Sequence, residues 1–145
     1  MIIGLGADHG GFELKEYIKE YLVKKGYEVR DFGSFDGASV DYPDVAFEVC
    51  EAYNKGGFDA GILFCGTGIG ISNAANKVPG IRCAHCTDSF SAKMAKQHNH
   101  ANFISLGGRI TGQCVAQEIV SAYLEASEEG GRHSVRVDKI MNYKG

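Results

Sequence analysis

The feature that most constrains the fold is a regular alternation of short apolar runs with longer amphipathic segments. The apolar runs predict five strands, at residues 2–7, 28–32, 60–64, 81–86 and 103–106. The segments between them carry apolar residues at helical spacing. This alternation predicts a parallel sheet with helices on both faces.

The predicted helices fill the segments between the strands. The first has apolar residues from Leu14 to Leu22 at intervals of three and four, and Gly26 supplies its stop. Later helices are expected at residues 43–54, 71–77, 89–97 and 113–125, with a short one near 134–142 after the hinge-like stretch EEGG at 128–131. We therefore expect residues 1–145 to form a single three-layer, doubly wound, Rossmann-like α/β domain.

Composition narrows the class of ligand and the compartment. The net charge of −3 comes without a long block of either sign, so neither nucleic acid nor an anionic membrane is expected as a partner. No run of about 18 apolar residues occurs, and the N-terminus lacks the features of a signal peptide. The five cysteines are scattered, which favours free thiols in a reducing compartment. We expect a cytoplasmic protein with a small ligand.

Polar residues follow several of the predicted strands. In a doubly wound sheet the ligand binds outside the carboxyl ends of the strands. Asp8 and His9 follow the first strand, CGTGIG at 65–70 follows the third, and GGR at 107–109 follows the fifth. An acid, an imidazole, a thiol, glycines and a guanidinium are therefore expected at one edge.

The CGTGIG loop narrows the chemistry further. It is not a P-loop, because no Gly-Lys-Ser/Thr ending follows. It also departs from the dinucleotide fingerprint, because Ile71 stands where a third glycine is needed and the loop follows the third strand. Bare N–H groups at a helix N-terminus bind anions, either a phosphate or a charge that develops during reaction. A different function also stays open for this fold, that of a nucleotide-binding or thiol-redox module.

Cys65 stands at the entrance of this loop. A thiol beside a positive helix terminus is suited to act as a base or nucleophile, so we expect a chemical role for it. Cys50, Cys83 and Cys114 are expected to be buried structural thiols. Cys83 and Cys86 should point to opposite faces of a strand, and no second pair exists, so no metal centre is predicted.

Two groups of basic residues leave alternatives open. The sequence HNH at 98–100 closes the helix before the last strand, where a histidine is often only a favourable cation. Arg132 and Arg136 would share one face of a helix, and two guanidiniums at that spacing suit a dianionic phosphate. They fit equally well as solvated surface arginines.

Taken together, the motifs resemble a known enzyme family. The chain is similar to type B ribose-5-phosphate isomerase, whose relatives include galactose-6-phosphate and allose-6-phosphate isomerases. The likeness covers nearly the whole chain and rests on six motifs: GADHGGFELK at 6–15, DYPD at 41–44, CGTGIGISNAANK at 65–77, HN at 98–99, GGR at 107–109 and GGRHSVRV at 130–137.

The resemblance implies a role for each matching residue. Cys65 would be the base that moves a proton between C2 and C1 through a cis-enediolate. Asp8 and His98 would assist opening of the furanose ring, and Thr67 would supply a hydroxyl to the sugar. The other implied contacts are with the phosphate (His9, Arg109, Arg132, Arg136), the sugar (Tyr42, Asn99) and the oxyanion (Gly66, Gly68, Ile69, Gly70).

The resemblance also implies an assembly and a cofactor requirement. It implies a homodimer or a dimer of dimers, with each site shared between two chains. Aldose–ketose interconversion needs a base, a ring-opening group and an oxyanion site, so neither a metal nor an organic cofactor is expected. Some family members carry a glutamate base where Ile71 stands, so the cysteine variant applies here. His100 departs from the family pattern, and its role stays open.

Overall fold

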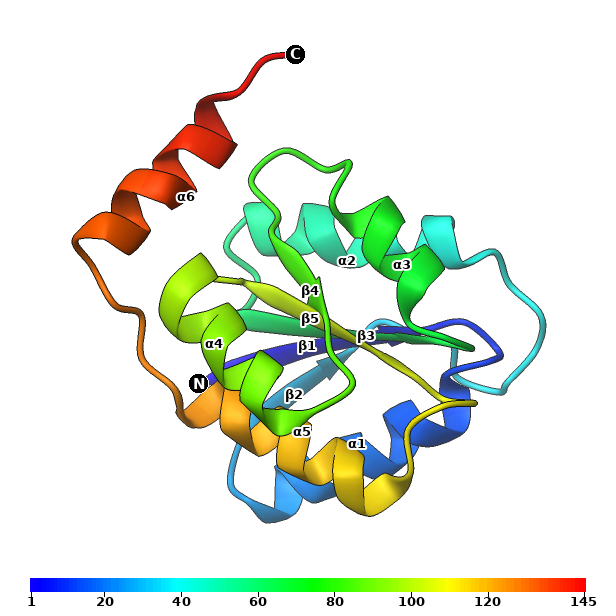
Figure 1. Cartoon of the computed structure of the whole chain (residues 1–145). Coiled ribbons are helices and arrows are strands. Elements are labelled where there is room, and N and C mark those ends of the chain that lie inside the picture. The colour runs from blue at the N-terminus through cyan, green and yellow to red at the C-terminus, as the bar shows by residue number, and fades with distance from the viewer.

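The protein is an α/β fold built on a five-stranded, entirely parallel sheet. The computed structural model describes residues 1–145. The strands are arranged in the order β2-β1-β3-β5-β4, and helices cover both faces (Figure 1). The elements along the chain are β1 (Ile2–Ala7), α1 (Phe12–Lys24), β2 (Glu28–Asp31), α2 (Tyr42–Asn54), β3 (Ala60–Cys65), α3 (Ile69–Ala75), β4 (Cys83–His85), α4 (Ser89–Asn99), β5 (Phe103–Gly107), α5 (Gln113–Glu125) and α6 (Arg132–Asn142).

The strand order explains which helix covers which face. Crossovers between parallel strands are right-handed, so the direction of each step along the sheet decides the face on which its helix lies. The steps β1 to β2 and β4 to β5 run in one direction, and α1 and α4 pack on one face with α5. The steps β2 to β3 and β3 to β4 run the other way, and α2 and α3 cover the opposite face. The expected three-layer, doubly wound fold is confirmed.

The hydrophobic core is divided by the sheet into two parts. On one face, α1, α4 and α5 bury apolar residues such as Ile18 and Ile119 against the strands. On the other face, Val49 of α2 and Ile71 of α3 pack against Phe103. Every residue of β3 is buried, as expected for a central strand covered on both sides.

The element boundaries differ from the predicted ones mainly at the site. Helix α3 begins at Ile69, two residues earlier than expected, because the glycine loop itself turns into the helix. Strand β4 is only 3 residues long, shorter at both ends than the predicted run at 81–86. Helix α6 begins at Arg132 rather than 134. The remaining elements lie within two residues of their predicted ends.

A buried ion pair anchors the segment that follows β2. Lys15 of α1 is 0% exposed, and its Nζ donates to both carboxylate oxygens of Asp31 and to the carbonyl of Ser34. Burial alone would raise the pKa of Asp31, but the hydrogen bonds from Lys15, the Gly33 N–H and Lys19 outweigh it and hold that pKa below its ordinary value. The pair therefore ties α1 to the chain that leads toward α2.

The two ends of the parallel strands lie on opposite sides of the domain. We call the side where the strands end the carboxyl edge, and the side where they begin the amino edge. Neither term refers to the edge strands β2 and β4. Figure 1 shows the loops after β1, β3 and β5 gathered on one side of the molecule, while α6 stands beside α4 on the opposite side. None of the six helices combines the length and apolar character needed to cross a bilayer.

Candidate active site

At the carboxyl edge, three loops approach one another so closely that only glycine fits between them. A Cβ atom added at Gly10 would lie 2.9 Å from the backbone nitrogen of Gly66, and one at Gly11 would lie 2.5 Å from the Cβ of Phe64. A Cβ at Gly107 would lie 2.6 Å from the carbonyl carbon of Thr67. The glycines after β1, β3 and β5 therefore let the backbones of the three loops touch.

Cys65 is the last residue of β3 and is held by its own loop. Its side chain is buried, and the backbone N–H of Gly68 donates a hydrogen bond to its Sγ at 3.1 Å. Gly68 has a φ of 82°, in the left-handed region that favours glycine. This turn directs the N–H back toward the sulfur, so the loop fixes the position of the thiol.

Ser105 binds the carbonyl group of the same residue, Gly68. Its hydroxyl, fully buried on β5, donates to the carbonyl oxygen of Gly68 at 2.8 Å. The Nδ1 of His85 lies 3.5 Å from the same hydroxyl. Ser105 therefore acts on the orientation of Gly68, whose N–H contacts the Cys65 sulfur.

Asp8 lies beside Cys65 across neighbouring strands. Ala7 pairs with Phe64 in the register of β1 and β3, so the residues that follow them are adjacent. One oxygen of Asp8, Oδ1, accepts hydrogen bonds from the N–H groups of Gly10 and Gly11 at 2.9 and 3.2 Å. The other oxygen, Oδ2, makes no hydrogen bond within the chain. A buried carboxylate with one free oxygen therefore stands next to the thiol.

Further predicted residues surround this pair. The Tyr42 ring packs against Gly70, where an added Cβ would lie 2.7 Å from the ring, and the Arg109 guanidinium lies against Gly66. Arg109 is fixed by its backbone N–H, which donates to the carbonyl of Gly66 at 3.0 Å. The structure thus brings together the predicted residues of the carboxyl edge (Asp8, His9, Tyr42, Cys65, Gly66, Thr67, Gly68, Ile69, Gly70, Arg109).

The backbone of the glycine loop leaves donors available. The N–H groups of Gly66 and Thr67 donate no hydrogen bond within the chain. Thr67 is exposed, and its Oγ1 accepts a hydrogen bond from the N–H of Ile69 at 3.2 Å. The loop therefore presents two N–H groups and a hydroxyl beside the Cys65 thiol.

The other cysteines differ from Cys65 in their surroundings. Burial raises the pKa of Cys50, Cys83 and Cys86 to about 12, so these groups stay thiols. Cys83 and Cys86 belong to core clusters on opposite faces of the sheet, as expected. Cys114 was expected to be buried, but it is exposed, because it lies away from the helix face of α5 that carries the core residues. All five cysteines are free.

The remaining predicted residues lie at the amino edge. His98 and Asn99 end α4, which runs back from the carboxyl edge to the start of β5. The carbonyl of Asn99 accepts a hydrogen bond from Arg82, just before β4. Arg132 and Arg136 are exposed on α6. Strand β3 has 6 residues, so at about 3.3 Å per residue its two ends are about 16 Å apart. One chain therefore holds two separate groups of predicted residues.

At the amino edge His98 meets two residues that the sequence did not single out. Its imidazole stacks on that of His133, with ring centroids 4.1 Å apart and planes 4° from parallel. The Nε2 atoms of both rings lie 3.6 Å from Oε1 of Glu129. Burial, followed by the nearby charges of His98 and Arg132, lowers the pKa of His133 below its ordinary value of 6.5.

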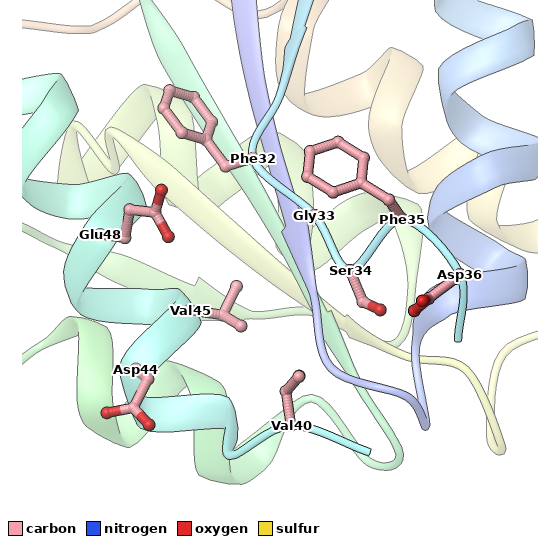
Figure 2. Close-up of a pocket in the computed structure, with 9 residues that line it drawn as sticks. All are labelled: Phe32, Gly33, Ser34, Phe35, Asp36, Val40, Asp44, Val45 and Glu48. Carbon is pink, nitrogen blue, oxygen red and sulfur yellow. The ribbon is translucent and has the colours of Figure 1, made fainter. Parts of the chain in front are cut away.

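Two open cavities of similar volume lie away from the Cys65 loop. A cavity of about 410 Å³ lies between α2 and the segment after β2 (Figure 2). Its rim carries the carboxylates of Asp36, Asp44 and Glu48, which would repel a phosphate. A cavity of about 390 Å³ at the amino edge is lined by Asn99 of α4 and Ile140 of α6.

Comparison with known proteins shows the family to which the chain belongs. The model of a family described as Ribose/Galactose Isomerase matches residues 3–140. Ribose-5-phosphate isomerase B of Escherichia coli is 47% identical over 138 residues, which cover 95% of this chain and 93% of the relative. D-erythrulose-4-phosphate isomerase of Pectobacterium atrosepticum is 45% identical, covering 98% of this chain and 94% of the relative. The solved structure of Clostridium thermocellum ribose-5-phosphate isomerase B superposes with a TM-score of 0.95 at 54% identity, covering 97% of this chain and 95% of that one.

Proposed function

The chain belongs to the ribose/galactose isomerase family, and from that premise we propose that it interconverts ribose 5-phosphate and ribulose 5-phosphate. The observation that carries the proposal is the Cys65 thiol, held by the Gly68 N–H beside unpaired backbone donors and the Asp8 carboxylate. A base, a second acid–base group and anion donors are the parts that an aldose–ketose isomerisation needs.

Cys65 is the proton-transfer base. Its thiolate removes the proton from C2 of the open-chain aldose, and the electron pair of that C–H bond moves into a cis-enediolate. The thiol then returns the proton to C1 while the hydroxyl proton passes from O2 to O1, so that the C2 carbonyl and the C1 hydroxyl of the ketose form together. The fixed position of the sulfur supports this role, because a base must be within hydrogen-bond reach of the proton that it takes.

The glycine loop stabilises the negative oxygen of the enediolate. The free N–H groups of Gly66 and Thr67 lie directly after the base, and residues 68–70 continue the same turn. Backbone donors packed by neighbouring loops are held in place before the charge develops, and preorganised donors of this kind give large stabilisation. The loop therefore binds a transient oxyanion more than a ground-state phosphate.

The surrounding side chains open the sugar ring and bind the substrate. The free oxygen of Asp8 and the His98 imidazole move the ring hydroxyl proton, while Thr67 and Tyr42 contact the sugar with Asn99. The phosphate is bound by residues that are exposed and bear hydrogen-bond donors, three of them permanently cationic (His9, Arg109, Arg132, Arg136).

Two copies of the chain complete each site. His98, Asn99 and the α6 arginines lie at the amino edge, so they reach the Cys65 loop only from a second chain. Helix α6 supports an assembly of this kind, because it leaves Val135 and Ile140 more than half exposed, at 55% and 58%. We therefore infer a homodimer, or a dimer of dimers, with Cys65 from one chain and His98 from the other in each site.

The chemistry requires neither a metal nor an organic cofactor, since base, acid and oxyanion donors all come from the chain. The alternative substrate is a hexose 6-phosphate, because the family description includes galactose isomerase and one relative is named galactose-6-phosphate isomerase subunit LacB. Turnover of ribose 5-phosphate, allose 6-phosphate and galactose 6-phosphate by the same purified sample, in the presence of a chelator, separates these substrates.

Replacing Cys65 with Ala tests the base directly. We expect the isomerisation rate to fall by about 100-fold or more, as is usual for loss of a general base. Inorganic phosphate should still bind, because the phosphate ligands are intact. The control is Cys114→Ala, which removes an exposed thiol on α5 and should leave the rate unchanged. A Cys65→Ala enzyme that keeps more than about a tenth of the wild-type rate would contradict the assignment.

A further inference from the structure

Three metal-binding side chains converge at the amino edge, away from the Cys65 loop. His98 comes from the last turn of α4, Glu129 from the loop before α6, and His133 from the first turn of α6. One ligand atom from each, a ring nitrogen of either histidine and a carboxylate oxygen of Glu129, lies within 4.8 Å of the others. The three side chains are therefore close enough to share a single ion.

The spacing of these atoms matches the coordination shell of a small divalent ion. Each Nε2 lies 3.6 Å from Oε1 of Glu129, which is longer than a hydrogen bond. A tetrahedral Zn²⁺ with bonds of about 2.0–2.2 Å holds its ligand atoms about 3.4 Å apart. The lone pair of each Nε2 lies in its ring plane, and the two planes are 4° from parallel, so the half-exposed His98 ring must turn out of the stack before both nitrogens can face one ion.

The backbone already holds the three residues together. The N–H of Glu129 donates to the carbonyl of Gln97 at 2.9 Å, and the Glu129 carbonyl contacts Nε2 of His100 at 2.6 Å. His133 is 7% exposed and stacks on His98, so its ring has little freedom to turn away. The loop backbone and His133 are therefore held in place, and the half-exposed His98 ring supplies the movement that binding an ion requires.

We propose that His98, Glu129 and His133 form a binding site for a divalent metal ion such as Zn²⁺. Two imidazoles and one carboxylate are a common ligand set for Zn²⁺, and water or a ligand takes the fourth position. This site could not be predicted from the sequence, because its three residues come from two helices and a loop and do not form a metal-binding motif. A bound ion would hold α6 against α4 and would bind the Nε2 atom of His98.

A functional consequence follows, and it rests on the proposed function. If His98 opens the sugar ring, bound Zn²⁺ takes away its acid–base nitrogen and inhibits the isomerase. Relief of inhibition by a chelator, together with weaker inhibition of Glu129→Gln than of wild type, is the expected pattern. Metal binding without inhibition would leave the site standing and would contradict the role of His98.

Binding is tested with Co²⁺ as a spectroscopic probe and Zn²⁺ as its competitor. Chelator-treated wild type should bind one Co²⁺ per chain, with visible absorption of a low-coordinate nitrogen and oxygen site, and Zn²⁺ should displace it. His133→Gln and Glu129→Gln should each weaken Zn²⁺ binding, measured by calorimetry, by about tenfold or more. Glu128→Gln is the matched control, because Glu128 pairs with Lys96 and lies outside the trio, and it should bind as wild type does.

Other results would overturn the proposal. Absence of saturable Co²⁺ binding would exclude the site, as would unchanged Zn²⁺ affinity in both His133→Gln and Glu129→Gln. A sulfur-to-cobalt charge-transfer band that disappears in Cys114→Ala would show that the exposed thiol binds the metal instead. Circular dichroism of each metal-free variant shows whether the fold is intact, and a variant that unfolds is replaced by Glu129→Ala or His133→Asn.

Discussion

At the carboxyl edge of the sheet, main chain packs on main chain, whereas at the amino edge side chains of separate helices meet across a loop. The Cys65 loop touches its neighbours through glycines, and Gly68 is bonded on both sides, to Cys65 and to Ser105. His98, Glu129 and His133 instead meet through a ring stack and two contacts longer than hydrogen bonds. The first region has a single arrangement, and the second can adjust.

This difference assigns different tasks to the two edges. Proton transfer and oxyanion stabilisation depend on positions held to a fraction of an ångström, and packed backbone provides such positions. Binding a phosphate tolerates small movements, because charge acts over a longer range. Mutations that disturb the packed loops of the carboxyl edge should therefore affect structure and turnover together, whereas loss of an exposed α6 arginine at the amino edge should mainly affect affinity.

The largest effect is expected for Gly11→Ala. Its Cβ would lie 2.5 Å from the Cβ of Phe64 and would also meet the Phe64 backbone, which has no room to move. We expect a loss of about 3 kcal/mol or more in the free energy of unfolding, at the upper end of overpacking costs, and little remaining activity. Gly112→Ala is the control, because nothing lies within 4 Å of its added Cβ. Equal stability of the two variants by urea denaturation would refute the close packing of the loops.

A smaller effect, confined to binding, is expected for Arg136→Ala. The side chain is exposed on α6, so its loss should leave the unfolding free energy nearly unchanged. Loss of one charge-assisted contact to a dianion should weaken binding of ribose 5-phosphate, and of inorganic phosphate as a competitor, by about tenfold. Lys139→Ala, on the same helix, is the control for general charge. Unchanged affinity for both ligands would identify Arg136 as a solvated surface residue.

The smallest effect is expected for Ser105→Ala. Removing its hydroxyl leaves the Gly68 carbonyl without its partner, at a cost of about 1 kcal/mol in stability, and lets the Gly68 N–H drift from the Cys65 sulfur. We expect kcat to fall by a few-fold, about 1 kcal/mol in the barrier, with KM nearly unchanged. Ser72→Ala removes a buried hydroxyl that contacts Cys83 instead and should leave kcat alone. Equal kcat values for the two variants would rule out a positioning role for Ser105.

The sequence predicted the carboxyl edge better than the amino edge for a physical reason. Strand ends are local features, so the pattern of apolar runs was enough to place Asp8, Cys65 and Arg109 at one edge. Ser105 was not found, because a serine inside an apolar strand gives no sign of its partner 37 residues away. His133 and Glu129 were not found either, because their meeting with His98 depends on how α6 packs.

The misjudged details have the same origin. Cys114 looked like a core residue among apolar neighbours, but the face of α5 that is buried is decided by its packing against α4 and the sheet. Helix α3 began earlier than predicted, because glycines that usually stop a helix here form its first turn. At Cys114 and at the start of α3, tertiary contacts therefore decided the structure against the expectation from local sequence.

Our central claim is that each site joins the carboxyl edge of one chain to the amino edge of another. The direct test mixes Cys65→Ala chains with His98→Ala chains, each inactive alone, by co-expression or by refolding together. A mixed dimer would have one site with both losses and one site with neither. About half of randomly formed dimers are mixed, each with one intact site, so activity should return to about one quarter of the wild-type value. If both residues act within one chain, every site in the mixture lacks one of them, and purified mixed dimers no more active than the separate variants would contradict the account.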